Sequence, residues 1–368
     1  MQDSSQYRTK SIQTLQSLNL EARTTQQLTR WQRTHYRAVR NWLGHYQATS
    51  SASQLEQVKG CLEAFFHLKE VEDWLGMKVV LQAEIDDSGY ELHEQLHTWG
   101  YYQEQITAYE QLLGRLDCAL DSTILSGLGI TSHTLGHYKQ AIAYYQRDLE
   151  IAEQLEDVDR EVSALSNMAL AYHFLKEYGV AHEYHDRCLA KVEQVADLAK
   201  QGAVFGNLGL TYKAQKNDER ALECFERHLV LARQAKNQLG QGSALGNLGN
   251  LYRRLGRLDD GLRCYKEYLA IAVEMNDRWS QGAALHGLSN FQRDTGDFSA
   301  ALQSALKSLV IFSDLNVPTE KTIGLFGRVR EKLGEEVYQN LLVGYLASDV
   351  AKPDVDRVEM ILKSQPAP

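Results

Sequence analysis

The sequence has 368 residues, a formal net charge of −9 and five scattered cysteines. Its acidic balance argues against general nucleic-acid binding, which depends on a basic surface. The cysteines lack CxxC or Cys/His metal spacing, so we expect a reduced, cytoplasmic protein without a metal site or cofactor. Residues 1–10 are polar and no run of about eighteen apolar residues occurs, which argues against a signal peptide and a membrane span.

Helix-forming residues dominate the chain. Leu, Ala, Glu, Gln and Arg are abundant, whereas β-branched runs with a period of two are scarce. No proline lies between residues 1 and 317, so nothing in this long stretch removes a helix donor or clashes with a preceding turn. The sequence therefore predicts an all-α fold.

Residues 1–55 are predicted to form a basic, amphipathic helical lead-in. Arginines outnumber acidic residues here, and Trp31, Val39 and Leu43 supply an apolar stripe. The stretch Ala48–Ser53 marks the end of this segment. We interpret the arginines as the solvated face of a helix that caps the rest of the chain. A face that binds phosphate or acidic groups is the alternative.

Residues 56–120 are predicted to form degenerate helical repeats. Leu62, Phe65 and Leu68 recur at helical spacing. Gly100 and Tyr109 have counterparts 36 residues further along, at Gly136 and Tyr145. Irregular units are expected next to an array, because terminal repeats must face solvent on one side.

Residues 121–316 contain a unit of forty residues that is repeated five times. One apolar column consists of Leu128, Met168, Leu208, Leu248 and Leu288. The next column holds mostly small residues, namely Gly129, Ala169, Gly209, Gly249 and Ser289. Such fixed-period similarity is typical of stacked helix pairs.

Each unit is predicted to consist of two helices joined by a short turn. In the first helix, a small residue such as Gly209 should let a neighbouring helix approach, and Tyr212, three residues on, should fill the space beside it. The glycine in the turn suits a helix C-cap with positive φ, at Gly136, Gly256 and Gly296. Residues 317–368 lose the register. We expect capping helices there, with Leu325, Val329 and Leu333 as apolar contacts, and then a tail.

The third unit resembles the tetratricopeptide repeat. The residues that carry the resemblance are Phe205, Leu208, Gly209, Tyr212, Ala221 and Phe225. The forty-residue period, with Gln-Gly before the first helix, is similar to the repeats of Pins-type spindle-orientation adaptors and kinesin light chains. The flanks resemble repeat proteins common in cyanobacteria. This resemblance implies a right-handed superhelical solenoid, capped by helices at both ends, whose first helices line a concave groove for partner proteins.

Polar side chains share the forty-residue phase at the positions that face this groove. They are Asn167, His173, Asn207, Lys213, Asn247, Asn250, Arg253, Arg254, Asn290 and Arg293. Asparagine can hold a peptide backbone through a donor and an acceptor, and arginine can bind a carboxylate with two hydrogen bonds. The pattern favours a groove for an acidic peptide over an inner face that is merely solvated.

Signals for catalysis are weak. The sequence lacks H-E-x-x-H, G-x-S-x-G and a phosphate-binding glycine loop. His182 and His185 could form half a metal site, but His185 occupies an aromatic column, which favours a packing role. We therefore expect no catalytic residues, no metal ligands and no enzymatic activity.

The sequence favours a non-catalytic adaptor or regulator that binds an acidic, extended or helical partner segment in the groove. A ligand- or peptide-gated signalling or transcriptional sensor is an alternative, with the basic N-terminal helices contacting an effector or nucleic acid. A structural scaffold that self-associates through a repeat end is a third. The partner is expected to be a protein or peptide, and not a membrane.

Overall fold

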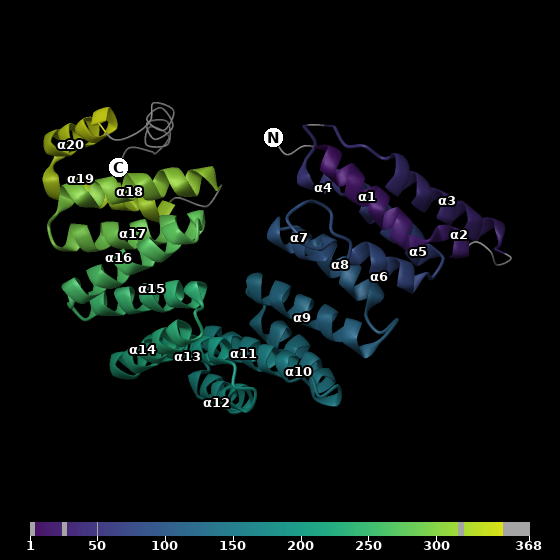
Figure 1. Ribbon diagram of the computed structural model, residues 1–368, viewed down its shortest axis with the longest axis horizontal. Helices are drawn as coiled ribbons and strands as arrows, with labels where there is room; N and C mark the ends of the chain where they lie inside the picture. Colours follow the sequence, from purple (N-terminus) through teal and green to yellow (C-terminus); the bar gives the residue numbers. More distant parts are fainter. Residues whose placement is uncertain (1–3, 24–27, 50, 316–319, 349–368) are drawn as a thin grey trace. The chain divides into compact units, whose positions relative to one another are not determined.

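The computed structural model describes residues 4–23, 28–49, 51–315 and 320–348 (Figure 1). This part of the chain forms twenty helices and no strand, apart from an isolated antiparallel bridge between Glu84 and Glu91. The predicted all-α class is confirmed. None of the described helices is both long and apolar enough to cross a membrane. The helices belong to two units, Met1–Glu177 and Tyr178–Pro368.

The first unit contains eleven described helices. They are α1 (Ser4–Leu18), α2 (Leu20–Arg23), α3 (Arg30–His45), α4 (Gln54–Gln57), α5 (Lys59–Glu70), α6 (Trp74–Leu81), α7 (Leu92–Thr98), α8 (Tyr102–Leu112), α9 (Cys118–Thr134), α10 (Tyr138–Gln154) and α11 (Val158–Phe174). Helix α3 packs against α1 and α5 and buries Val39 and Leu43. Its arginines are exposed: Arg30, Arg33, Arg37 and Arg40. Whether this face contacts an effector or nucleic acid stays a prediction.

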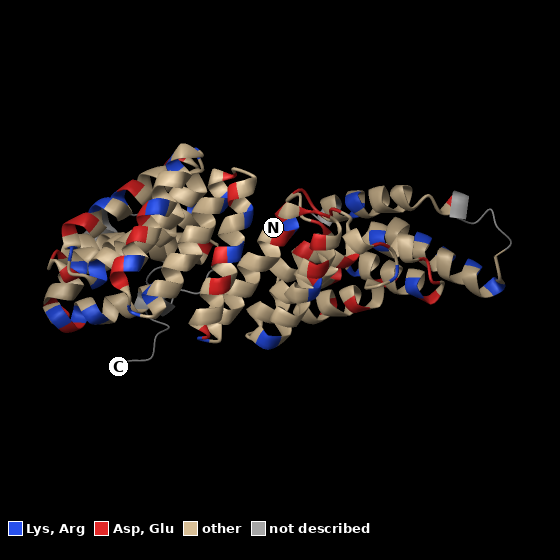
Figure 2. Ribbon diagram, turned by 90° about the horizontal axis from the view of Figure 1, so that it is seen from below, with Lys and Arg blue, Asp and Glu red and all other residues tan. Residues whose placement is uncertain are grey.

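The second unit contains nine described helices. They are α12 (Tyr178–Gln194), α13 (Leu198–Ala214), α14 (Asp218–Gln234), α15 (Gln238–Arg254), α16 (Leu258–Glu274), α17 (Arg278–Asp294), α18 (Phe298–Asp314), α19 (Glu320–Leu333) and α20 (Glu335–Ser348). Figure 2 shows basic and acidic residues interspersed along the helices. The domain boundaries expected after residues 55, 120 and 316 stay predictions, and the expected tail after residue 348 lies outside the described residues.

The forty-residue period becomes a strict helical rule in the structure. Each helix from α9 to α18 has 17 residues, and within this range three residues separate consecutive helices. Gly136, Gly256 and Gly296 have the predicted positive φ, between 74° and 83°. The other turns place ordinary side chains in the same conformation, including Lys176 at 63° and Lys216 at 61°. Local geometry thus repeats even where the glycine does not.

Glycines on the first helices permit close packing, as predicted. The ring that lies against each glycine comes from the second helix of the unit, however, and not from the expected tyrosine of the first helix. A Cβ atom on Gly209 would collide with the ring of Phe225, and one on Gly249 with that of Tyr265. Both rings belong to the second helix of the same unit. The ring of Tyr212, three residues after Gly209 on the same helix, lies against the ring of His182.

The helices after the array form their own apolar cluster with α18. Leu325, Phe326 and Val329 of α19 are buried, together with Tyr338 of α20 and Leu306 of α18. The expected apolar contacts of α19 are thereby confirmed for Leu325 and Val329, and Leu333 packs against the same cluster. This packing positions α19 beside α17 as well as α18.

Candidate functional site

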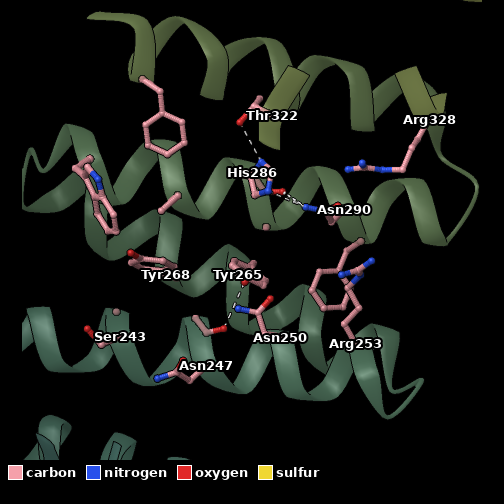
Figure 3. Close-up of a pocket in the computed structure, with 17 residues that line it drawn as sticks. Ser243, Asn247, Asn250, Arg253, Tyr265, Tyr268, His286, Asn290, Thr322 and Arg328 are labelled. Atoms are coloured by element: carbon pink, nitrogen blue, oxygen red, sulfur yellow. Dashed lines mark hydrogen bonds between the residues drawn. The ribbon is translucent and has the colours of Figure 1, made fainter. Parts of the chain in front are cut away.

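The second unit contains a cavity of about 930 Å³ on the side of α15 and α17 that α19 borders. Its lining comes from five helices, α15 to α19. Figure 3 shows Arg253 and Arg328 at one end of this cavity, and Ser243 and Tyr268 toward the other. The volume lies within the range typical of ligand sites in proteins.

Small residues keep the cavity open. Gly242, Ser243 and Gly246 supply its wall on α15, and Ala283 and Gly287 its wall on α17. None of these carries a side chain long enough to fill the space. Rings of α16 already pack against two of these glycines, Tyr268 against Gly242 and Tyr265 against Gly287, and the same rings line the hollow.

The N-terminal halves of α15 and α17 border an aromatic end. Tyr268 and Phe312 are each 9% exposed, whereas Trp279 is 55% exposed. Trp279 and Tyr268 also line a smaller adjoining hollow of about 190 Å³. Burial raises the pKa of Tyr268, so its hydroxyl stays neutral. This end therefore offers a largely aromatic surface, with the carboxylate of Asp277 in the adjoining hollow.

Amide and imidazole groups occupy the middle of the cavity. The Asn290 Nδ2 atom donates to the backbone oxygen of His286 at 3.0 Å. His286 Nδ1 lies 3.2 Å from the hydroxyl oxygen of the buried Thr322, which joins α17 to α19. The Tyr265 hydroxyl donates to the Gly246 carbonyl at 3.4 Å, and burial raises its pKa to about 12. These bonds connect α16 to α15 and α19 to α17 around the cavity.

Arginines gather at the other end and share one aspartate. Arg253 Nε donates to Asp294 Oδ2 at 2.5 Å, and Arg293 Nη2 donates to Asp294 Oδ1 at 2.6 Å. Burial tends to raise the pKa of Asp294, but the hydrogen bonds from both arginines outweigh it and the pKa is lowered. Arg328 lies close enough that burial, then Arg293 and Arg253, lower its pKa. Cationic charge is thus in excess at this end.

A second hollow of about 550 Å³ adjoins the arginine cluster. It is lined by Lys213, Asn250, Arg253, Arg254 and Asp294. Arg254 forms an ion pair with Asp218 and donates to the Lys213 carbonyl at 3.3 Å. Burial, and then the charge of Arg254, lower the pKa of Lys213.

The structure brings only some of the sequence-predicted residues together. Four of them line the main cavity: Asn247, Asn250, Arg253 and Asn290. Arg293 does not line the main cavity, but it donates to Asp294, which also accepts from Arg253. Lys213 and Arg254 border the second hollow. Asn207 is half-buried on α13 and lines neither hollow. Asn167 and His173 are half-buried on α11, in the first unit.

Sequence reasoning missed several residues of the cavity. Trp279, His286 and Thr322 line it without belonging to a repeated polar column, as does Arg328. Arg328 and Thr322 lie on α19, beyond the last repeat, where no periodicity assigns a face. Asp294 was also missed, although its place directly after Arg293 could have indicated a partner for the arginine column.

Solved structures with a similar fold are known, but no curated protein matches the sequence. The apo form of RapI has a TM-score of 0.51 and 14% identity, over 94% of this chain and 86% of its own. A signal transduction ATPase with numerous domains from Pyrococcus horikoshii, which has a tetratricopeptide repeat sensor, also has a TM-score of 0.51, at 12% identity over 90% of this chain and 55% of its own. A putative kinesin light chain from Podosopora anserina has a TM-score of 0.43 and 15% identity, over 53% of this chain and 97% of its own. At these identities the two likenesses with a TM-score of 0.51 show the fold alone.

The tetratricopeptide repeat model matches four overlapping stretches, residues 120–194, 160–234, 200–272 and 240–314. Together these stretches span more than half of the sequence and coincide with the regular helices α9 to α18. The predicted resemblance is confirmed, and the chain belongs to the tetratricopeptide repeat family.

Proposed function

We propose that this protein is a non-catalytic adaptor that binds an acidic segment of a partner protein on the first helices of its second unit. The observation that carries the proposal is the arginine cluster of Arg253, Arg293 and Arg328 at the end of an open cavity. Guanidinium groups bind carboxylates through paired, charge-assisted hydrogen bonds. Because Asp294 offsets only part of this charge, the cluster favours a further anion.

Amide groups beside the arginines suit a peptide backbone. Asn247 and Asn250 project from α15 and Asn290 from α17, all along the same cavity. An asparagine side chain supplies both a donor and an acceptor, so it can pair with a peptide unit whatever side chains that unit carries. The combination supports a segment that is held along its backbone and selected by its charge.

The family supports the same conclusion at a coarser level. Tetratricopeptide repeats are typically interaction scaffolds, and stacked helix pairs present extended surfaces to other proteins. An exposed charge pair contributes only about 0.2–1 kcal/mol, so recognition requires several such contacts together. Partner binding should accordingly weaken as the salt concentration rises.

Charge reversal at Arg253 and Arg293 tests the proposal. The full chain and its Arg253→Glu, Arg293→Glu variant are immobilised and exposed to an extract of the organism that encodes the protein. We expect the variant to lose the partner that the unchanged chain captures, because the site would now repel acidic segments. Circular dichroism checks that helicity is retained.

A matched control reverses two arginines on second helices. Arg233 and Arg263 also pair with carboxylates, of Glu267 and Asp260, but line neither hollow. The Arg233→Glu, Arg263→Glu variant changes the net charge equally and should still capture the partner. If both variants lose it, or neither does, the groove proposal fails.

A further inference from the structure

The cavity is not built by the repeats alone. Helix α19 lies outside the forty-residue register, yet its Thr322 and Arg328 form part of the lining. Thr322 is 2% exposed and contacts His286 of α17, while the neighbouring Leu325 is fully buried. These contacts set α19 against the repeat wall, so that Arg328 is aimed at the same end as Arg253 (Figure 3).

Arg328 lies among like charges. Asp294 already accepts hydrogen bonds from Arg253 and from Arg293. Partial burial and the proximity of those two arginines lower the pKa of Arg328. A bound anion would relieve this repulsion, and a carboxylate matches the planar geometry of the guanidinium group.

The aromatic end of the cavity suits an apolar group of the ligand. Trp279 lines the cavity, yet more than half of its surface is exposed, at 55%. Tyr268 and Phe312 stand in the same lining. An apolar side chain placed here would remove aromatic surface from water, which is the main source of binding energy in such sites.

The size of the cavity suits a short occupant. A cavity of about 930 Å³ suits a compact group of a few residues. The asparagines along the cavity, Asn247, Asn250 and Asn290, suit the free backbone groups of an extended segment, whereas a helix pairs those groups internally. The cavity therefore favours a short, extended segment over a helical one.

We propose that this cavity is a specificity pocket for a short peptide segment that carries a carboxylate and a large apolar side chain. Arg328 and Arg253 bind the carboxylate, and Trp279, Tyr268 and Phe312 bind the apolar side chain. This inference rests on the proposed function and adds to it the ligand chemistry and the role of α19. The carboxylate comes from an acidic side chain or from a free chain terminus, and the experiment separates the two.

The probe is an array of synthetic glycine–serine peptides of about six residues, a length suited to a cavity of this size. Each carries a phenylalanine with a glutamate at varied spacing, a phenylalanine alone or a glutamate alone, and each is made with a free and with an amidated C-terminus. The full chain should bind only peptides that combine phenylalanine with a carboxylate. Binding that survives amidation assigns the carboxylate to the glutamate, and binding without glutamate that amidation removes assigns it to the terminus. No binding, or binding that does not require both groups, overturns the proposal.

Variants locate the binding. Arg328→Gln should weaken the best peptide about tenfold, since one charge-assisted hydrogen-bond partner is lost. Gly246→Leu should weaken it at least as much by filling the cavity, and its Cβ meets only ordinary contacts, the nearest at 3.6 Å from Tyr268. Arg330→Gln is the matched control on α19, because Arg330 pairs with Glu335 and does not line the cavity. It should bind like the unchanged chain.

The outcomes separate this pocket from the broader function. Peptide binding that is unaffected by Arg328→Gln and Gly246→Leu overturns the pocket. If the Arg253→Glu, Arg293→Glu variant nevertheless loses its partner, the adaptor proposal survives without it. Equal losses in Arg328→Gln and Arg330→Gln also overturn the pocket, because they would indicate a general effect of charge on α19.

Discussion

Two glycines of α15, three residues apart, serve opposite purposes. Gly249 faces the ring of Tyr265 so closely that a Cβ atom would collide with it. Gly246 borders the cavity, and a Cβ there would lie 3.6 Å from the nearest atom of Tyr268. One glycine therefore allows two helices to pack closely, whereas the other leaves open space in the cavity. The same residue type in the same repeat does not imply the same role.

The same substitution at both glycines should give the largest contrast. Gly249→Leu should lower the free energy of unfolding by about 3 kcal/mol, because the added side chain must displace a buried ring. Gly246→Leu should leave it unchanged or raise it by up to about 0.8 kcal/mol, since leucine favours helix more than glycine does. Chemical denaturation followed by circular dichroism measures both. Equal destabilisation would show that the wall at Gly246 is also closed by packing.

This contrast explains how far the sequence alone could go. The columns that contain Leu128 and Gly129 repeat because each unit packs its two helices in the same way. The fold and the turns could therefore be predicted from the sequence. The arginine column could be found in the same way, through Arg253 and Arg293. Arg328 could not, because it follows the last repeat and its place depends on how α19 packs in space.

Turn residues show a related limit. The glycine at position 256 predicts a positive φ from the sequence. Lys216 adopts the same conformation, at 61°, although lysine does not predict it. There the flanking helices impose the geometry on a side chain that does not prefer it. Asp294 likewise gave no periodic signal, because ion pairs between neighbouring repeats depend on the distance between helices.

The third and fourth units offer a second comparison, at a buried position of the second helix. His228 packs against Gly202 and Gly206, as Tyr268 does against Gly242 and Gly246 one unit later. Burial lowers the pKa of His228 from 6.5 to about 4. Within the described part of the chain, no hydrogen-bond partner reaches its Nδ1 atom. The histidine is thus held in its neutral form where the next unit has a phenol.

Acid should therefore weaken the third unit through His228. In the unfolded chain His228 binds a proton below about pH 6.5, whereas in the folded chain it does so only below about pH 4. The free energy of unfolding therefore falls as the pH drops through this window. The contribution of His228 should be about 2 kcal/mol as the pH falls from about 7 to about 5. The His228→Tyr variant places at this position the residue that the next unit has there, Tyr268, and should remove this part of the pH dependence of unfolding. An unchanged slope would show that His228 is solvated enough to titrate normally.

The smallest effect concerns two aspartates that pair with arginines in or next to the repeated column. Asp294 lines the second hollow and engages Arg253 and Arg293, whereas Asp218 engages Arg254 and lines neither hollow. Both removals raise the net charge equally, so Asp218→Asn is a control for Asp294→Asn. If Asp294 competes with a ligand carboxylate, Asp294→Asn should tighten binding of an acidic peptide about threefold, which is the scale of one partly exposed charge pair. Asp218→Asn should leave that affinity unchanged, as measured by fluorescence polarisation.

The sign of the Asp294→Asn effect distinguishes two roles for the same carboxylate. Tighter binding that shrinks as salt is added means that Asp294 occupies charge that a ligand would otherwise use. Weaker binding means instead that Asp294 holds Arg253 and Arg293 in the orientation that a ligand requires, because its hydrogen bonds fix both guanidinium groups. In that case Asp294 preorganises the two arginines for binding. Its removal would then cost more affinity through their lost orientation than it gains through the removed negative charge.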